Sequence, residues 1–195
     1  MNPSVEQIVP VIVENRRRFQ EFCLSLSEEE LALPVPDSSW IVKDFASHLD
    51  TLDTLFDGFV ATLQAGGTVD MTRGADGAAF DLDAWNDAQV AERRNWSIQR
   101  IFEEAAANRE RLIAAIGGLD DEQISRNMHF SDPKRGAADF PLKAFLVGWA
   151  QHDPIHVADM IKALPERAAD EAVKSWLANP FVSGYQASMS TAPAS

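Results

Sequence analysis

Two histidines four residues apart, His152 and His156, carry the most chemical information in this chain. In a helix, residues at positions i and i+4 lie on one face, a turn apart. Two imidazoles placed in this way can bind one metal ion, and zinc-binding helices use the same spacing. Pro154 lies between them and is predicted to bend the helix, because it supplies no backbone donor for the carbonyl of Ala150.

A third histidine, His48, falls within the apolar face of another predicted helix rather than opposite it. That face consists of Ile41, Phe45, His48, Leu49, Leu52, Phe56, Phe59 and Leu63. The chain has only four histidines, and the fourth, His129, lies in a segment predicted to be irregular, where we expect a surface residue. His48, His152 and His156 therefore form a candidate metal site. Three imidazoles leave positions open for water, as catalytic sites do, whereas structural sites have four protein ligands, usually with cysteine.

Imidazole ligands suit Zn²⁺, Ni²⁺, Fe²⁺ or Mn²⁺, and the sequence does not choose among these ions. Ligating histidines usually donate their second N–H to a carboxylate or a carbonyl. Asp44, Asp153 and Asp159 lie close enough in sequence to the three histidines to be candidates for that role. Glu92, on a predicted long helix, is a candidate general base. We expect substrates to reach the site beside two predicted loops, residues 68–79 and 127–139.

The spacing of apolar residues by threes and fours predicts four main helices and no strands. The main helices are expected at about residues 5–26, 40–66, 82–116 and 141–164, with short helices at about 27–30, 120–126 and 166–178. The expected fold is an all-α four-helix bundle with additional short helices. We expect one domain over residues 1–180, followed by a tail, residues 181–195, that is disordered or loosely packed.

Composition narrows the class of protein further. The net charge of −13 argues against a nucleic-acid partner, because such proteins neutralise phosphates with Lys and Arg. No apolar run approaches the roughly 18 residues that a membrane span needs, and the first residues have no signal-peptide pattern. Cys23, the single cysteine, rules out an internal disulfide. We therefore expect a cytoplasmic protein with a small-molecule substrate, and a homodimer formed through an exposed apolar helix face.

Three segments, taken in order, resemble the DinB-like superfamily, which includes the YfiT-type proteins and the N-terminal domains of mycothiol-dependent maleylpyruvate isomerases. The segments are WIVKDFASHL at residues 40–49, Trp85-Asn86 at the start of a helix, and the pair His152 and His156. The resemblance covers about residues 5–165. It implies a four-helix bundle, often dimeric, with a divalent metal held by His48, His152 and His156.

The resemblance also implies a reaction class. Members of known activity are thiol transferases or isomerases that use a low-molecular-weight thiol, and some relatives hydrolyse reactive compounds. The resemblance implies a His–Glu–His set of metal ligands in the thiol-dependent isomerases, whereas the middle ligand position of this chain is a histidine. Three functions follow as alternatives: a metal-dependent thiol S-transferase or hydrolase, a non-catalytic bundle that binds a small molecule or a metal, and a structural bundle whose histidines are core residues.

Overall fold

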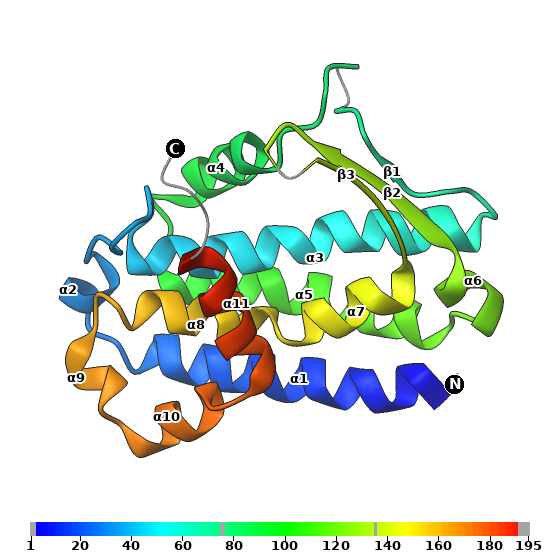
Figure 1. The fold of residues 1–195 in the computed structure, drawn as a ribbon. Helices are drawn as coiled ribbons and strands as arrows, with labels where there is room; N and C mark the ends of the chain where they lie inside the picture. Colours follow the sequence, from blue (N-terminus) through cyan, green and yellow to red (C-terminus); the bar gives the residue numbers. More distant parts are fainter. Residues whose placement is uncertain (1–2, 75–76, 135, 191–195) are drawn as a thin grey trace.

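The computed structural model describes residues 3–74, 77–134 and 136–190. This part of the chain forms eleven helices and three short strands, which are labelled in Figure 1. The elements are α1 Pro3–Leu24, α2 Glu28–Leu31, α3 Val42–Gln64, β1 Asp70–Met71, α4 Leu82–Arg93, α5 Ile98–Gly117, α6 Asp121–Ser125, β2 Asn127–Asp132, β3 Gly136–Pro141, α7 Leu142–Ala150, α8 His152–Met160, α9 Pro165–Ala168, α10 Glu171–Leu177 and α11 Pro180–Ser190.

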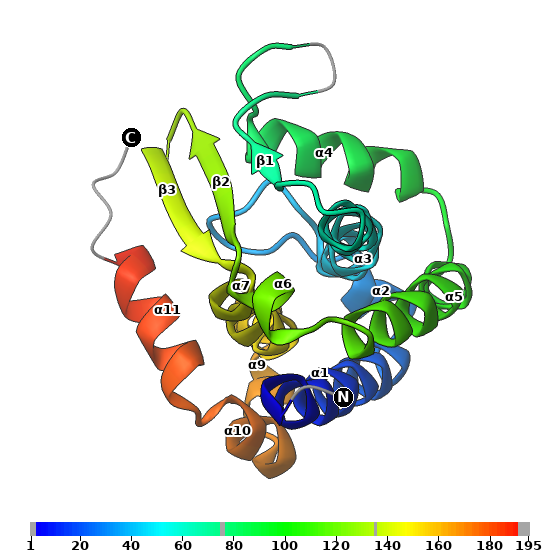
Figure 2. The same cartoon turned by 90° about the vertical axis from the view of Figure 1, so that its right-hand side faces the viewer.

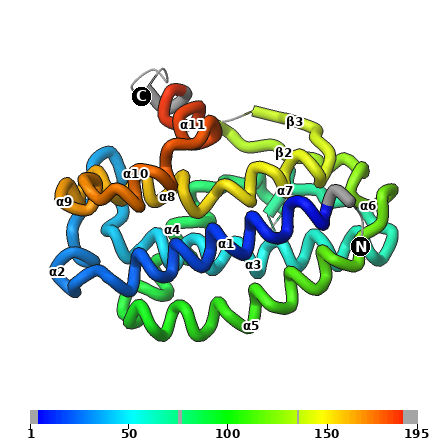
Figure 3. Tube along the Cα trace, turned by 90° about the horizontal axis from the view of Figure 1, so that it is seen from below, coloured from blue at the N-terminus to red at the C-terminus, as the bar shows by residue number. Residues whose placement is uncertain are grey.

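The predicted four-helix bundle is confirmed. Helices α1, α3 and α5 run side by side, and α7 and α8 follow one another along the fourth side (Figures 1 and 2). Helix α1 packs against α5, α7 and α8, while α3 packs against α5 and α8. Seen from below, α1 lies between α5 and the α7–α8 pair (Figure 3). No helix in the described ranges is both long enough and apolar enough to span a membrane.

The prediction of a chain without strands was wrong. Residues 127–139, expected to be irregular, form most of the hairpin β2–β3, and β1 from the predicted 68–79 loop pairs in parallel with β2. Most side chains of the hairpin are exposed or only partly buried. Residues 127–131 alternate between polar and apolar side chains, a strand signal that the sequence analysis missed, whereas residues 136–141 show no such alternation.

Three predicted helices are interrupted. The predicted helix 82–116 is two helices, because the hydroxyl of Ser97 accepts a hydrogen bond from the Arg100 amide and starts α5. The predicted helix 141–164 divides at Gln151 into α7 and α8, and 166–178 divides into α9 and α10. The break at Gln151 leaves both α7 and α8 packed against α1.

The segment expected to be a loose tail forms a further helix through residue 190. Helix α11 packs against α8, outside the four main helices (Figures 1 and 2). Its side chain Val182 is buried. The rest of the predicted tail, residues 191–195, lies outside the described residues.

Two apolar clusters fill the bundle, one toward each end. One is centred on Phe56, Leu112 and Leu146, and the other on Phe19 and Leu49. Between them the helices carry buried polar side chains instead of apolar ones. These residues are Asn15 and Arg16 on α1, Asp50 and Asp53 on α3, and Asp153 on α8. A buried polar layer therefore crosses the middle of the bundle.

Asn15 compensates for the backbone break at Pro154. The carbonyl of Ala150 would normally accept from the amide at position 154, which proline lacks. The side-chain amide of Asn15 donates to this carbonyl at 2.6 Å. Its oxygen accepts from the indole N–H of Trp176 at 2.9 Å. One buried side chain thus ties α1 to the junction of α7 and α8 and to α10.

Replacing Asn15 with Ala should destabilise the fold by about 2–4 kcal/mol, because a buried carbonyl and a buried N–H lose their partners. Urea unfolding measured without metal gives this free energy. The effect should shrink by about 1 kcal/mol in a Pro154→Ala background, because the new amide at position 154 can donate to the Ala150 carbonyl. Strict additivity of the two substitutions would contradict this account.

Candidate metal centre

The structure brings His48, His152 and His156 together at the boundary between α3 and α8. The three histidines can each offer one ring nitrogen such that all three nitrogens lie within 4.8 Å of one another. Nε2 of His152 lies 3.0 Å from Nε2 of His156, as their i,i+4 spacing requires. The ring of His48 faces both from α3, with centroid distances of 5.3 Å and 4.8 Å.

The environment keeps at least two of these rings neutral. Burial lowers the pKa of His48 well below its ordinary value, and the neighbouring His156 and His152 lower it further. Burial, followed by His156, has the same effect on the pKa of His152. A neutral imidazole has a free lone pair for a metal ion. Nδ1 of His152 has no hydrogen-bond partner among the described residues, whereas Nδ1 of His156 faces the carboxylate of Asp159 at 3.4 Å.

These positions fit a divalent ion. Two imidazole nitrogens, each about 2.1 Å from one ion, are at most about 4.2 Å apart. The pair on α8 meets this limit at 3.0 Å, and the widest pair, within 4.8 Å, needs only a small side-chain rotation. An all-imidazole set suits zinc, nickel or iron, with positions left for other ligands.

Asp159 is the only one of the three predicted carboxylate partners that lies against a histidine ring. Its Oδ2 is 3.4 Å from Nδ1 of His156, and its Oδ1 accepts from Lys162 at 2.8 Å. The pKa of Asp159 is lowered, because the hydrogen bonds from His156 and Lys162 outweigh the effect of burial. Asp159 is therefore ionised and orients the His156 ring.

The other two predicted partners, and the candidate base, lie elsewhere. Asp44 accepts from the backbone N–H of Ile41 at the start of α3 and pairs with Arg94 at 3.2 Å. Asp153 pairs with an arginine of α1. Glu92, the candidate general base, has a side chain that is 69% exposed. The sequence spacing would have allowed Asp44 and Asp153 to contact the histidines, but Asp44 instead caps the start of its own helix and Asp153 pairs with a facing helix.

Arg16 of α1 holds Asp153, the residue next to His152. The Nε and Nη2 atoms of Arg16 donate to the two carboxylate oxygens of Asp153 at 2.9 Å and 3.1 Å. Nη1 lies 3.5 Å from Asp53 on α3. Burial would raise the pKa of Asp153, but the charge and hydrogen bonds of Arg16 lower it. The carboxylate is thus ionised, and α8 is fixed to α1 beside the histidines.

Arg109 of α5 completes this buried charge cluster, which we define as Arg16, Asp53, Arg109 and Asp153. Its Nε donates to Asp53 at 2.7 Å, and its guanidinium lies 4.6 Å from the ring centroid of Trp149. The cluster contains residues of α1, α3, α5 and α8. All four sides of the bundle therefore meet in one set of ion pairs next to the histidines.

His129 lies apart from the other three histidines. It is on β2, and its Nδ1 is 2.7 Å from Asp139 of β3. Its side chain is 45% exposed. The structure agrees with the prediction of a surface residue.

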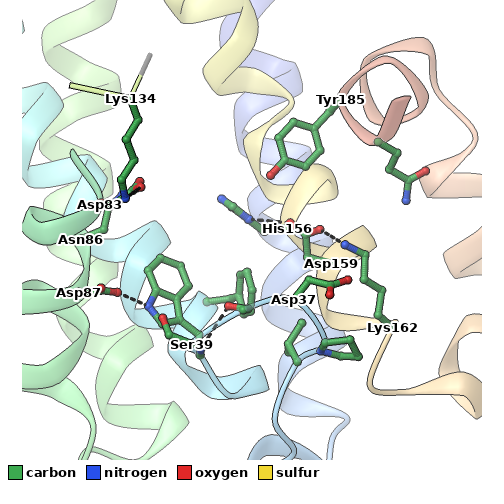
Figure 4. Close-up of a pocket in the computed structure, with 16 residues that line it drawn as sticks. Asp37, Ser39, Asp83, Asn86, Asp87, Lys134, His156, Asp159, Lys162 and Tyr185 are labelled. Carbon is green, nitrogen blue, oxygen red and sulfur yellow. Dashed lines mark hydrogen bonds and ion pairs between the residues drawn. The ribbon is translucent and has the colours of Figure 1, made fainter. Parts of the chain in front are cut away.

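A cavity of about 740 Å³ opens beside the triad, and His156 and Asp159 form part of its wall (Figure 4). Its other lining residues are Val35, Pro36, Asp37, Ser38, Ser39, Trp40, Phe45, Asp83, Asn86, Asp87, Lys134, Lys162, Tyr185 and Gln186. Of the two loops predicted to flank the site, the segment 127–139 contributes Lys134, and the described parts of the other, residues 68–74 and 77–79, contribute no lining residue. The connection before α3, helix α4 and helix α11 form much of the remaining wall, which sequence analysis did not predict.

Asn86 is a site residue to which sequence analysis gave no role, although it appeared in the Trp85-Asn86 motif. It lies in the first half of α4, is 8% exposed and lines the cavity. Burial is the main influence on the pKa of His48 and lowers it, while a side-chain hydrogen bond with Asn86 acts in the opposite direction. Asn86 therefore lies next to the His48 ring, a contact that only the structure supplies.

The sequence matches the profile of one protein family. Residues 13–152 match the mycothiol maleylpyruvate isomerase N-terminal domain. The matched range includes His48 and His152 and ends before His156. Among curated proteins, no significant sequence match was found.

Solved structures show the same fold. YfiT from Bacillus subtilis, described as a probable metal-dependent hydrolase with an unusual four-helix bundle topology, superposes with a TM-score of 0.65 at 17% identity, over 85% of this chain and 89% of YfiT. The mycothiol-dependent maleylpyruvate isomerase gives a TM-score of 0.62 at 10% identity, over 80% of this chain, and a variant of it gives 0.61. This chain spans 60% of the isomerase.

The buried polar layer makes stability depend on pH through Asp50. Burial raises the pKa of Asp50 to about 6, although Arg93, whose Nε is 3.5 Å away, lowers it. The unfolded value is about 3.9. The fold therefore prefers the protonated form, and the stability that Asp50 contributes is fully present below about pH 4 and is lost as the pH rises through 6.

An Asp50→Asn variant should gain about 1 kcal/mol relative to the wild type between acidic and neutral pH, because it carries no ionisable group there. Urea unfolding of both proteins without metal, at a series of pH values, measures the difference. Glu103→Gln, on the exposed face of α5, is the control and should show no such trend. A constant difference across the series would contradict the raised pKa of Asp50.

Proposed function

Because the chain belongs to the mycothiol maleylpyruvate isomerase N-terminal domain family, we propose that it is a metal-dependent enzyme whose divalent ion is held by His48, His152 and His156. The proposed reaction is transfer of a small thiol, or hydrolysis, on a small-molecule substrate. The proposed ions are Zn²⁺, Ni²⁺, Fe²⁺ and Mn²⁺. A homodimer and a cytoplasmic location remain predictions from the sequence.

The observation that carries this proposal is the convergence of three imidazole rings beside a large cavity. Core histidines normally use their ring nitrogens in hydrogen bonds to other kinds of protein group. Here the Nε2 atoms of His152 and His156 face one another at 3.0 Å, and one nitrogen of each of the three rings lies within 4.8 Å of the others. This arrangement favours the metal site over the structural bundle with core histidines.

The chain's own residues suit this chemistry. A bound divalent ion would act as a Lewis acid and would lower the pKa of a bound water or thiol toward neutrality. The neutral rings of His48 and His152 present lone pairs, and Asp159 orients His156. Asn86 lies beside the His48 ring and can hold its orientation. The three histidines are buried or partly buried, which limits access of bulk water.

The choice between thiol transfer and hydrolysis rests on the relatives. The isomerase is described as mycothiol-dependent, and YfiT as a probable hydrolase. Histidine at the middle ligand position differs from the His–Glu–His pattern expected for the isomerases, which argues against maleylpyruvate isomerisation itself. A non-catalytic bundle that binds a small molecule or a metal is the alternative.

Metal analysis tests the proposed site directly. Purified protein, dialysed against each divalent ion and then against buffer, should retain about one ion per chain, because three imidazoles bind these ions well. His48→Ala, His152→Ala and His156→Ala should each lose most of it. Plasma mass spectrometry gives the metal content, and circular dichroism confirms that each variant is folded.

His129→Ala is the matched control, since it removes a histidine outside the triad and should retain the metal. A wild-type protein that binds no metal would refute the metal-dependent function. Equal loss in the His129 variant would show that histidine number, rather than the triad, determines binding.

Turnover separates the enzyme from the binding module. The metal-loaded protein should accelerate the reaction of a thiol with an electrophilic acceptor, or the hydrolysis of an activated ester or amide, at least about 100-fold over the His48→Ala variant. Absorbance assays with panels of thiols and ester substrates measure the rates. Stoichiometric metal with no turnover in any panel would favour the non-catalytic bundle.

A further inference from the structure

Helix α4 buries an asparagine at a position where a bundle helix normally buries an apolar side chain. Among its twelve residues, all within the described ranges, Asn86 and Val90 are the two that are buried. Asn86 is more than nine-tenths buried and lines the cavity beside the triad. Buried amides are normally hydrogen-bonded, so the residue that Asn86 contacts indicates what the amide does there.

That residue is His48. Burial, the largest influence on the His48 ring, lowers its pKa, whereas a side-chain hydrogen bond with Asn86 raises it. An upward effect is that of an acceptor, because an acceptor favours the protonated ring. Within the described structure, Oδ1 of Asn86 has no partner other than this ring. The carboxamide oxygen is therefore the atom that faces the N–H of His48.

The next residue of α4, Asp87, acts on the same ring through Trp40. Its Oδ1 accepts from the indole N–H of Trp40 at 2.7 Å, and the centroids of the Trp40 and His48 rings are 4.9 Å apart. Figure 4 shows Asn86 and Asp87 together on α4 beside the cavity. Two successive residues of α4 thus restrict the His48 ring, one by a hydrogen bond and the other through an aromatic contact.

Polar contacts near both ends of α4 hold this helix in place. At its start, the backbone N–H of Leu82 donates to Asp132 of β2 at 3.0 Å. Just past its end, Nζ of Lys43 on α3 donates to the carbonyls of Arg94 and Trp96 at 3.0 Å and 2.9 Å. These contacts fix α4 relative to α3, the helix that carries His48, and so keep the Asn86 amide at the ring.

We propose that Asn86 is a positioning residue of the metal centre: its Oδ1 accepts the N–H of the His48 ring and so leaves the other ring nitrogen, with its lone pair, to the metal ion. The inference rests on the proposed function for the ion itself. A neutral imidazole carries one proton on either nitrogen, and the hydrogen bond that one nitrogen makes determines which nitrogen binds a metal. Asn86 thus has the role for His48 that Asp159 has for His156.

The two acceptors differ in charge, and this difference has a chemical consequence. A carboxylate raises the basicity of the imidazole that it holds, so that the imidazole donates more electron density to the ion. An uncharged amide raises that basicity less. Asn86 therefore orients His48 while leaving a bound ion more able to lower the pKa of a water or a thiol.

Nitrogen-15 NMR of the histidine rings tests the hydrogen bond without metal. At neutral pH, His48 of the metal-free protein should be a single tautomer, because the Asn86 oxygen stabilises one N–H form. In Asn86→Leu, whose side chain also branches at Cγ but has no acceptor, both tautomers should be populated. Spectra of His48→Ala assign the signals. Mixed tautomers in the wild type, or an unchanged single tautomer in Asn86→Leu, would overturn the proposal.

Competition with a chelator then measures the affinity for Zn²⁺. Asn86→Leu should bind Zn²⁺ about 10- to 100-fold more weakly than the wild type, the usual effect of losing the acceptor that orients a ligand. Asn86→Asp keeps an acceptor of the same reach and should bind at least as tightly as the wild type.

Val90→Ala is the matched control, because it weakens the packing of the same helix without removing the hydrogen bond. It should keep the affinity and the His48 tautomer of the wild type. Equal losses of affinity in Asn86→Leu and Val90→Ala, or an equal loss in Asn86→Asp, would show that Asn86 only packs. If Asn86→Leu does not fold, the wild-type tautomer and the affinity of Asn86→Asp decide.

Zn²⁺ loading separates failure of this inference from failure of the proposed function. In the loaded wild type, the His48 nitrogen that carries the proton without metal should still carry it. A wild type that binds no Zn²⁺ contradicts the proposed function, and the tautomer comparison then decides the hydrogen bond by itself. A wild type that binds Zn²⁺ through that same nitrogen, or an Asn86→Leu variant of unchanged affinity, contradicts the inference alone.

Discussion

The ion pair between Arg16 and Asp153 determines how the first and last main helices of the bundle meet, and the histidine arrangement depends on it. Arg16 is 4% exposed and reaches Asp153, Asp53 and the carbonyl of Leu49. Removing either partner would leave a charge in the protein interior, which is far more costly than losing a surface pair. A bundle held only by apolar contacts could slide or rotate α8 at small cost.

The polar layer also explains why the core is divided into two apolar clusters. A continuous apolar core would contribute more hydrophobic stabilisation, and a buried ion pair rarely adds to stability. The layer instead fixes the positions of α1, α3, α5 and α8 relative to one another close to the triad. Asn15 serves the same end, because it satisfies the carbonyl that Pro154 leaves free at the start of the histidine-bearing helix.

Helical periodicity was enough to predict the bundle and the three histidines that meet in it. His48 lies within an apolar face, and His152 and His156 share one by their spacing, so each had to point inward. Where the helices end was less predictable. Ser97 starts α5 inside a stretch that reads as one long helix, and Asp44 caps α3 instead of meeting His48. In both cases a side chain caps the start of a helix, and the spacing of apolar residues does not indicate such caps.

The walls of the cavity could not be predicted for a different reason. They come from the connection before α3, from α4, from the β2–β3 turn and from α11, which are brought together only by tertiary packing. Helix α11 has little periodicity, and the hairpin is largely solvent-facing. The contact between Asn86 of α4 and His48 of α3 depends on how the two helices pack, which the spacing of residues within each helix does not predict.

The separation of Arg16 and Asp153 by 137 residues has a consequence for biosynthesis. His48 is translated early, but His152, His156 and the partner of Arg16 are translated late. A nascent chain therefore carries Arg16 without Asp153, and only one of the three triad histidines, until α8 has left the ribosome. The metal site and the polar layer that supports it can form only after synthesis of most of the chain, so a product truncated before α8 would have neither.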